Sequence, residues 1–304
     1  MAETNRFTEL NNGKKMPLMG YGTFLSQDEK ALHDNIVYAV VDCGYRHIDT
    51  ASLYGNEHVV GDALQECFEK GIKREDIFIT TKLWRSEFGD VDGSLKKSLE
   101  KLKLEYVDLY LIHWTVTDVD WDTYEIKGPP MHEVWTNMEK QVDAGLTKSI
   151  GVSNCNAMLF VDMLAGAKIK PVNNQIENNP HLAQKNLVEF TKKFGCTTTA
   201  YAPIGASGFT GYNMLDDETL KKIAEKHNAS AAQIALAWNM QRGVIVIPKS
   251  MNKERIKENY EALSVDLSEE DVEEINKIDQ GKRNFDPAGW DSPEYGWKYA
   301  PMFD

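Results

Sequence analysis

The sequence predicts an α/β fold, and in particular a closed (β/α)8 TIM barrel. Eight short apolar runs recur along the chain, at residues 18–21, 46–49, 77–82, 107–113, 149–152, 172–176, 197–201 and 244–248. Stretches with the 3.6-residue periodicity of amphipathic helices lie between these runs. Strands that alternate with helices pair in parallel through crossover connections. A doubly wound sheet usually has about five or six strands, so eight such units favour a barrel.

The helical stretches are predicted from their periodicity and from the glycines near their ends. They cover residues 56–69, 95–104, 131–144, 184–194, 217–227 and 231–241. Glycine readily adopts the left-handed conformation that ends many helices. We therefore expect helix ends at Gly44, Gly71, Gly145 and Gly195.

An amino-terminal hairpin is expected before the first repeat. The short runs 6–10 and 14–16 flank Asn11-Asn12-Gly13, and Asn-Gly between two alternating runs is a strong local signal for a hairpin. Two longer interruptions follow the fourth and seventh runs, at residues 114–130 and 202–215. These long loops would leave the carboxyl ends of strands, where barrel enzymes build their active sites.

The tail, residues 284–304, contains three prolines and the aromatic residues Trp290, Tyr295 and Trp297, without helical periodicity. Aromatic side chains need a surface to cover, so we expect an ordered C-terminal arm. Neither a low-complexity linker nor a further repeat divides the 304 residues. The chain is therefore expected to be a single domain over residues 1–304.

The composition is that of a soluble globular protein, with 42% hydrophobic and 27% charged residues. The net charge of −13 argues against a nucleic acid or an anionic membrane surface as partner. The amino-terminal residues lack the apolar run of a signal peptide, and no stretch reaches about 18 apolar residues. Four cysteines occur without C-x-x-C spacing. We expect a cytoplasmic protein with reduced thiols.

Four titratable side chains gather at the predicted carboxyl ends of neighbouring strands. Asp49, Lys82 and His113 end the second, third and fourth runs, and Tyr54 follows the second by a few residues. A lone lysine or histidine at such a position is usually structural. The convergence of all four at adjacent strand ends of a barrel favours an active site.

These four groups suit the donation of a proton to a carbonyl oxygen. A tyrosine phenol with a pKa of about 10 is a slow acid at neutral pH. A nearby lysine ammonium is expected to lower the pKa of Tyr54, and a carboxylate would keep that lysine charged and oriented. A neutral histidine can polarise the carbonyl through a hydrogen bond. The sequence has no metal-ligand spacing and no nucleophile beside a base, so an organic hydride donor is expected and no metal.

The chain resembles the aldo-keto reductases in seven ordered segments. They are Gly22-Thr23, Asp49-Thr50-Ala51-x-x-Tyr54-Gly55-Asn56-Glu57, Thr81-Lys82-Leu83-Trp84, Leu111-Ile112-His113-Trp114, Gly151-Val152-Ser153-Asn154, Asn174-Gln175-Ile176-Glu177, and Ile247-Pro248-Lys249-Ser250 with Arg255, Glu258 and Asn259. The match runs through residues 6–285, and the tail is similar to that of the aldose and xylose reductase branch. This resemblance implies NADPH-dependent reduction of aldehydes and aldose sugars, with ketones as further candidates.

The resemblance also implies a role for each matched position. Tyr54 would be the general acid, Lys82 and Asp49 its activating pair, and His113 the group that orients the carbonyl. The residues expected to contact the substrate are Phe24, Trp84, His113 and Trp114. Those expected to contact the cofactor are Gly22, Thr23, Asp49, Ser153, Asn154, Gln175, Tyr201, Pro203, Ile204, Gly205, Lys249, Ser250, Arg255, Glu258 and Asn259. Among the latter, Ser153, Asn154 and Gln175 would bind the nicotinamide carboxamide, and Tyr201 would stack on the ring.

A basic cluster carries the choice between NADPH and NADH. Lys249, Lys253, Arg255 and Lys257 fall within nine residues of an acidic chain. A solvated helix face would give the same pattern, but the end of a strand followed by the start of a helix also makes an anion site. By resemblance, Lys249, Ser250 and Arg255 would hold the 2′-phosphate, with Glu258 and Asn259 at the adenine. NADPH is therefore the expected cofactor.

The chain departs from the family pattern at several positions. Phe24 stands where tryptophan is common, Thr115 where proline is common, and Ala202 where a serine often contacts the pyrophosphate. Leu25 replaces a lysine, and the loop 202–215 contains no carboxylate, so the strap that some relatives fold over the cofactor is expected to be loose. The pocket should still be aromatic, with Trp121 as a further candidate.

Two other functions are compatible with these observations. One is a ketone, ketosteroid or diketo-acid reductase on the same scaffold, a choice that depends on the tail and the loop after the fourth strand. The other is a non-catalytic nucleotide-binding subunit. Loss of the tyrosine, lysine or histidine would favour this second function, and all three are present. The expected partner is a small carbonyl substrate, and the expected assembly is a monomer or a weak homodimer.

Overall fold

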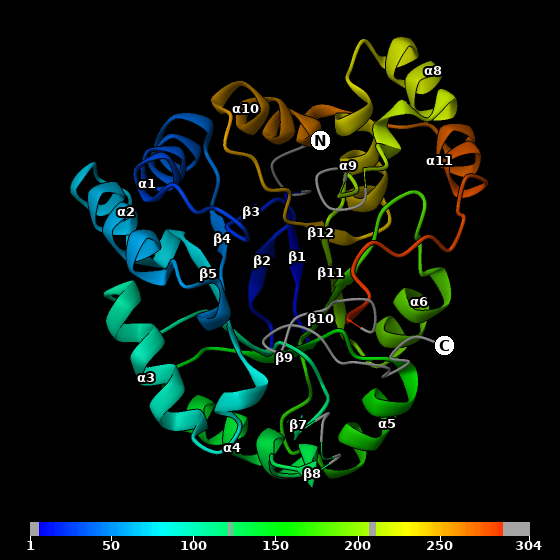
Figure 1. The fold of residues 1–304 in the computed structure, drawn as a ribbon. Coiled ribbons are helices and arrows are strands. Elements are labelled where there is room, and N and C mark those ends of the chain that lie inside the picture. Colours follow the sequence, from blue (N-terminus) through cyan, green and yellow to red (C-terminus); the bar gives the residue numbers. More distant parts are fainter. Residues whose placement is uncertain (1–5, 121–122, 124, 207–210, 288–304) are drawn as a thin grey trace.

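Eight parallel strands form a closed barrel surrounded by helices (Figure 1). The computed structural model describes residues 6–120, 123, 125–206 and 211–287. The barrel strands, in chain order, are β3 (Tyr21–Gly22), β4 (His47–Asp49), β5 (Phe78–Leu83), β6 (Leu109–Ile112), β9 (Ile150–Ser153), β10 (Asn173–Glu177), β11 (Thr197–Tyr201) and β12 (Val244–Val246). Each is paired with its neighbour in that order. The predicted fold class is confirmed.

The barrel closes between its first and last strands. Met19 forms a parallel bridge with Val246, the Gly20 amide donates to the Val246 carbonyl at 2.8 Å, and the Val246 amide donates to the Leu18 carbonyl at 2.8 Å. These bonds use backbone groups just before β3, so the first predicted run, 18–21, contributes to the barrel along its whole length. Closure removes both free edges of the sheet.

The helices lie outside the strands. They are α1 (Glu29–Val37), α2 (Glu57–Glu69), α3 (Val91–Leu102), α4 (Met131–Asp143), α5 (Ala157–Gly166), α6 (Lys185–Lys193), α8 (Glu218–His227), α9 (Ala231–Gln241), α10 (Lys253–Glu261) and α11 (Glu269–Asn276). The six predicted helices correspond to α2, α3, α4, α6, α8 and α9. A π-helical segment, Tyr38–Cys43, continues α1 and ends at Gly44. Gly44, Gly71, Gly145 and Gly195 have φ angles of +93°, +96°, +74° and +76°, which confirms the predicted left-handed helix ends.

Helix α3 begins four residues before the predicted start, and α5 was not recognised from its periodicity. The Asp90 side chain caps α3 by accepting the Gly93 amide at 2.9 Å, so the helix begins at Val91. Helix α5 is apolar around most of its circumference, which leaves little contrast between a buried and an exposed face. The core lies in two places: between the barrel and its helices, and between α8, α9 and α11.

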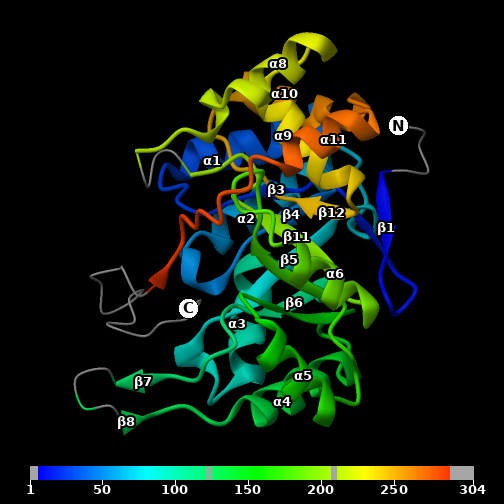
Figure 2. The same ribbon diagram turned by 90° about the vertical axis from the view of Figure 1, so that its right-hand side faces the viewer.

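The predicted amino-terminal hairpin is present as β1 (Phe7–Glu9) and β2 (Lys15–Pro17), which pair antiparallel. Its turn is attached to the barrel through the Asn12 side chain, which donates to Ser149 Oγ at 2.9 Å. The loop after β6 contains a second hairpin, β7 (Val119–Asp120) and β8 (Glu125–Ile126), where the sequence predicted only a loop. Figure 2 shows this hairpin projecting from the barrel.

Two sequence predictions fall mostly outside the described residues. The C-terminal arm is described only to residue 287, so Trp290, Tyr295 and Trp297 lie outside it, as does Trp121 in the loop after β6.

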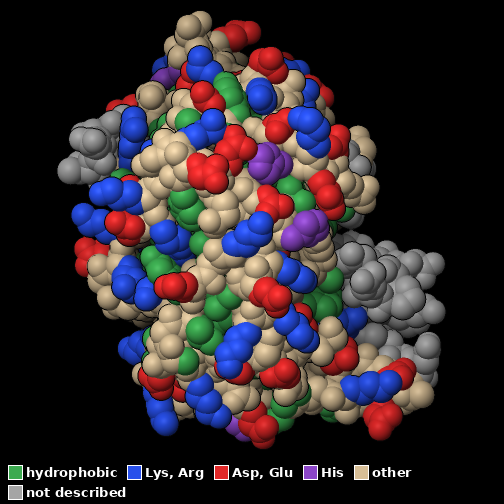
Figure 3. Space-filling model, turned by 90° about the vertical axis from the view of Figure 1, so that its left-hand side faces the viewer, with side chains coloured by type: hydrophobic (Ala, Val, Ile, Leu, Met, Phe, Trp, Pro, Cys, Tyr) green, Lys and Arg blue, Asp and Glu red, His purple; other side chains and the backbone are tan. Residues whose placement is uncertain are grey.

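Acidic and basic side chains are intermixed on the face that α1, α2 and α3 form (Figure 3). Ion pairs such as Lys103–Asp62, at 2.5 Å, and Lys96–Asp92, at 2.7 Å, lie on these helices. Among the described helices, none is long and apolar enough to cross a membrane.

Candidate functional site

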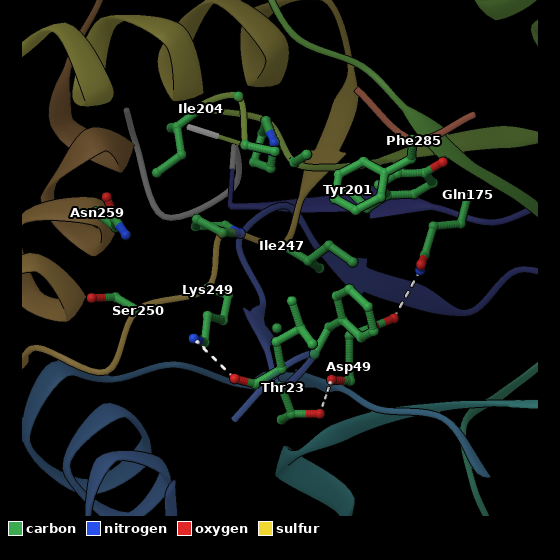
Figure 4. A pocket seen from close by; sticks show the side chains of 18 of the residues that line it. Thr23, Asp49, Gln175, Tyr201, Ile204, Ile247, Lys249, Ser250, Asn259 and Phe285 are labelled. Carbon is green, nitrogen blue, oxygen red and sulfur yellow. Dashed lines mark hydrogen bonds between the residues drawn. The ribbon is translucent and has the colours of Figure 1, made fainter. Parts of the chain in front are cut away.

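The carboxyl ends of the barrel strands surround a pocket of about 1130 Å³. Loops that follow strands all round the barrel contribute to its wall, together with the first turns of α10 and the residue Phe285. Pockets for small ligands usually measure about 300–1,000 Å³, so this volume suits a large cofactor together with a small substrate. Figure 4 shows the pocket as elongated, with Gln175 and Asp49 towards one end and Ser250 and Asn259 towards the other.

Lys82, Asp49 and Tyr54 are joined by direct hydrogen bonds. Lys82 points from β5 into the barrel, and its Nζ donates to Asp49 Oδ1 at 2.6 Å, to the Thr50 carbonyl at 2.9 Å and to the Tyr54 hydroxyl at 3.2 Å. The lysine is 0% exposed and the aspartate 2% exposed. These three acceptors use all three ammonium protons, so the lysine is held in one orientation with the Tyr54 hydroxyl on its pocket side.

The Tyr54 phenol is held in its protonated form. Burial raises the pKa of Tyr54 well above its usual value of 10, and the Asp49 carboxylate raises it further. Burial also raises the pKa of Asp49 and lowers that of Lys82. The expected net lowering of the Tyr54 pKa is therefore not found, because burial and the Asp49 charge outweigh the stabilisation that Lys82 gives the phenolate. Lys82 and Asp49 lie together behind the phenol, so their charges offset each other there and burial decides the direction.

His113 follows β6 and lies beside the phenol. Its ring centroid is 5.6 Å from that of Tyr54 and 5.1 Å from that of Trp84, both edge to face. Burial lowers the pKa of His113 well below 6.5, and the nearby Lys82 charge lowers it further. The histidine is therefore neutral at pH 7, as the sequence predicted, and it can donate one hydrogen bond.

Two buried neutral histidines predict an acid-sensitive fold. The pKa of His47, inside the barrel, is lowered to about 3 by burial, and that of His113 lies well below 6.5. Both folded pKa values lie below the unfolded one, so the unfolded state takes up protons first. The contribution of these two histidines to the free energy of unfolding is fully present above pH 6.5. Below that pH the free energy of unfolding falls by about 1.4 kcal/mol per pH unit for each histidine.

Urea unfolding at about pH 7, 6 and 5 measures how steeply the free energy of unfolding changes with pH. The variant His47→Gln should lose stability less steeply than the wild type, by about 1.4 kcal/mol per unit. The control His132→Gln replaces an exposed histidine and should keep the wild-type slope. Equal slopes in all three proteins would mean that His47 is not held neutral.

A polar network extends from Asp49 into the region predicted for the nicotinamide. Gln175 on β10 donates to Asp49 Oδ2 at 2.8 Å, and Ser153 Oγ donates to the Gln175 carbonyl at 2.7 Å. Asn154 has a left-handed backbone, with φ of +54°, and its Oδ1 accepts the Tyr201 hydroxyl at 2.8 Å. Its Nδ2 donates to the His113 carbonyl at 3.1 Å and to Ser153 Oγ at 3.2 Å. These side chains offer both donors and acceptors for a carboxamide beside the four candidate catalytic groups.

The far end of the pocket contains the start of α10 and two of the four predicted cations. Lys249 is exposed, with its Nζ 3.5 Å from the Leu25 carbonyl, and Arg255 also lines the pocket. Lys253 instead lies over the ring of Tyr38, 5.2 Å from its centroid, and Lys257 is 3.9 Å from the carboxylate of Glu261. Of the four cations from which an anion site was predicted, only Lys249 and Arg255 line the pocket. Lys253 and Lys257 lie on other sides of α10 and contact other residues.

Every other predicted site residue lines the same pocket, apart from Lys82, which is buried behind Tyr54. The lining includes Gly22, Thr23, Phe24, Asp49, Tyr54, Trp84, His113, Trp114, Ser153, Asn154, Gln175, Tyr201, Pro203, Ile204, Gly205, Lys249, Ser250, Arg255, Glu258 and Asn259. Their individual contacts with cofactor or substrate stay predictions.

Sequence reasoning missed Phe285 and Asn252. The ring of Phe285 lies 5.6 Å from Tyr201 and 6.4 Å from Phe24, centroid to centroid. It is held there by the fully buried Glu177 carboxylate, which accepts the Phe285 amide at 3.0 Å. Asn252 lines the pocket and caps α10 by accepting the Arg255 amide at 2.9 Å. An asparagine directly before a helical stretch is a capping signal that could have identified Asn252.

The loop after β11 is anchored from outside the pocket. Tyr212 hydrogen-bonds to His181 Nδ1 at 2.7 Å, and His181 Nε2 lies 3.0 Å from Asp217. Tyr212 therefore attaches this loop, which has no carboxylate of its own, to the rest of the protein. The loose strap over the cofactor stays a prediction. The neighbouring Gly208 and Phe209 lie outside the described residues.

Comparison with known proteins agrees with the geometry. A family model for the aldo/keto reductase family matches residues 18–280. The chain is 42% identical over 292 residues to aldose reductase B of Dictyostelium discoideum, a match that covers 90% of this chain and 93% of the relative. It is 41% identical to an aldose reductase of Encephalitozoon cuniculi, in a match that covers 93% of this chain and 96% of that relative. It is 38% identical to the NAD(P)H-dependent D-xylose reductase I,II of Candida tropicalis, in a match that covers 93% of this chain and 95% of that relative.

Proposed function

Since the chain belongs to the aldo/keto reductase family, we propose that it reduces aldehydes and aldose sugars to alcohols, with NADPH as hydride donor and Tyr54 as proton donor. The relatives named above are aldose reductases and an NAD(P)H-dependent xylose reductase, which supports an NAD(P)H-dependent oxidoreductase. The observation that carries the proposal is the bond from buried Lys82 to both Asp49 and the Tyr54 hydroxyl at the wall of the pocket.

The pocket fits a nicotinamide dinucleotide. Ser153, Asn154 and Gln175 supply the hydroxyl and amide groups for a carboxamide, and Tyr201 supplies an aromatic face for its ring. At the other end, Arg255 and the amino terminus of α10 suit a phosphate, because cations and free backbone amides both favour an anion there. When bound, this cofactor supplies the hydride.

The protein's own part in the reaction is to handle the carbonyl oxygen. Neutral His113 donates a hydrogen bond to that oxygen and polarises the carbonyl. Tyr54 gives its proton to the oxygen as negative charge develops, forming the product hydroxyl. An alkoxide is a far stronger base than a phenolate, so the raised pKa of Tyr54 does not prevent this transfer. Lys82, 3.2 Å away, stabilises the phenolate left behind, and Asp49 keeps Lys82 oriented.

Arg255→Ala is expected to weaken NADPH binding by about 1.5–3 kcal/mol, the range for a hydrogen bond to a charged group, and to leave NADH binding almost unchanged. Arginine presents a planar, always charged fork that matches a phosphate. Fluorescence titration with each cofactor measures the two dissociation constants. Lys253→Ala is the matched control, because Lys253 is on the same helix as Arg255 but its ammonium group lies over the ring of Tyr38. Equal weakening of NADPH and NADH by Arg255→Ala would rule out a 2′-phosphate contact.

A further inference from the structure

Tyr54 lies in a short turn that does little to fix its own position. The turn is one 3-10 segment, Ser52–Tyr54, preceded by Ala51, which makes no side-chain cap. Inside it, the Tyr54 amide donates to the Ala51 carbonyl at 3.1 Å and the Gly55 amide to the Ser52 carbonyl at 3.3 Å. Single 3-10 turns have poor hydrogen-bond geometry and depend on their surroundings. The position of the phenol therefore depends on contacts between this turn and other elements.

Two side chains tie the turn to the rest of the barrel. On its carboxyl side, Asn56 Nδ2 donates to the Thr23 carbonyl at 2.9 Å. On its amino side, Ser52 Oγ donates to Glu87 Oε2 at 2.6 Å and lies 3.1 Å from the Lys82 carbonyl. The serine hydroxyl has one proton, and the shorter contact, to a carboxylate, is the stronger hydrogen bond.

Glu87 belongs to the loop after the next strand, β5. It ends a 3-10 turn, Arg85–Glu87, and its Oε2 also accepts the Trp84 amide at 2.9 Å. A capping box within this loop accounts for the bond to Trp84. It does not account for the bond to Ser52, which comes from 35 residues earlier in the chain. One carboxylate oxygen thus joins the loop that carries Tyr54 to the loop that follows Lys82.

We propose that Glu87 is a positioning residue for the proton donor: with Ser52 it holds the Tyr54 turn at a fixed distance from the end of β5. The contact between Tyr54 and Lys82, 3.2 Å long, spans the same two segments that Glu87 joins. Trp84, whose ring packs against His113, is held by the same oxygen. Displacing a catalytic group by about 1 Å can cost up to a hundredfold in rate, so a contact of this kind affects turnover. The inference rests on the proposed function for the role of Tyr54.

The kinetic test uses two single variants and their combination. Glu87→Ala and Ser52→Ala should each lower kcat roughly tenfold or more, with NADPH affinity changed by less than about twofold. The double variant should be about as impaired as either single one, because both substitutions remove the same contact. Glu87→Gln should return kcat to within about threefold of the wild type, since its amide oxygen can accept both bonds.

The matched control is Asp92→Ala, which removes an exposed carboxylate in α3 whose described partner is Lys96 at 2.7 Å. It should leave kcat unchanged. If Ser52→Ala has wild-type kcat, or if the two substitutions add fully in the double variant, Glu87 acts only as the cap of its own loop and the proposal is wrong.

Amide hydrogen exchange tests the same contact without catalysis. Glu87→Ala should speed exchange in the segments 52–57 and 83–88, whereas Ser52→Ala should speed it mainly in 52–57 and Asp92→Ala in neither. Unchanged exchange in 52–57 in the Glu87→Ala protein would overturn the proposal. If the wild-type protein reduced no carbonyl compound, the proposed function would fail, and the exchange data alone would still decide whether Glu87 holds the turn.

Discussion

Replacing Tyr54 by phenylalanine is expected to lower the turnover number for carbonyl reduction at least about a hundredfold, the scale of general acid catalysis. The substitution removes the hydroxyl that Lys82 binds and keeps the ring, which packs 5.0 Å from Phe24, centroid to centroid. NADPH affinity should change by less than about twofold, because the lost group contacts the carbonyl oxygen. Steady-state rates should be accompanied by single-turnover measurements, since cofactor release can mask the chemical step.

Tyr260→Phe is the matched control for this experiment. Its hydroxyl donates to the Gly44 carbonyl at 2.8 Å, outside the pocket lining, so turnover should be unaffected. A Tyr54→Phe enzyme that kept more than roughly a tenth of wild-type turnover would exclude Tyr54 as the proton donor.

Replacing Lys82 by methionine is expected to lower the free energy of unfolding at pH 7 by about 3–5 kcal/mol, the cost of breaking a buried ion pair. Methionine fills a similar volume but leaves the Asp49 carboxylate, 2% exposed, without its counter-charge. Turnover should also fall, because Lys82 no longer stabilises the Tyr54 phenolate. The stability deficit should shrink as the pH is lowered, since burial already raises the pKa of Asp49 and a protonated carboxyl needs no counter-ion.

The double variant Lys82→Met/Asp49→Asn separates stability from catalysis. It removes both charges, so urea unfolding should show much of the lost stability recovered, whereas turnover should stay low. A loss below about 1 kcal/mol in the single Lys82→Met variant would mean that the pair contributes no more than an exposed one does.

The fold and the clustering of the four candidate catalytic side chains could be predicted from the sequence because both depend on local patterns. Eight apolar runs separated by amphipathic stretches determine a barrel, and a barrel brings consecutive strand ends together. Asp49, Lys82 and His113 are therefore neighbours by topology alone, and Tyr54 follows Asp49 closely enough to join them.

The features that were missed or wrongly predicted depend on contacts between distant residues. The direction of Lys253 depends on Tyr38, some 215 residues away, whose ring lies beneath its ammonium group. Phe285 reaches the pocket because buried Glu177 binds its amide across 108 residues. The pKa of Tyr54 depends on how fully the barrel encloses it, which charge patterns do not reveal. Neither periodicity nor spacing encodes such contacts.

The most direct test of the proposed function is NADPH consumption by the purified protein with xylose, glyceraldehyde, benzaldehyde and a ketosteroid, each measured beside the Tyr54→Phe variant. We expect NADPH oxidation that depends on the aldehydes and aldoses, forms the corresponding alcohols and is nearly abolished in the variant. Binding of NADPH without consumption of any of the four compounds would instead indicate a nucleotide-binding protein without reductase activity, and turnover of the ketosteroid alone would indicate a ketone reductase.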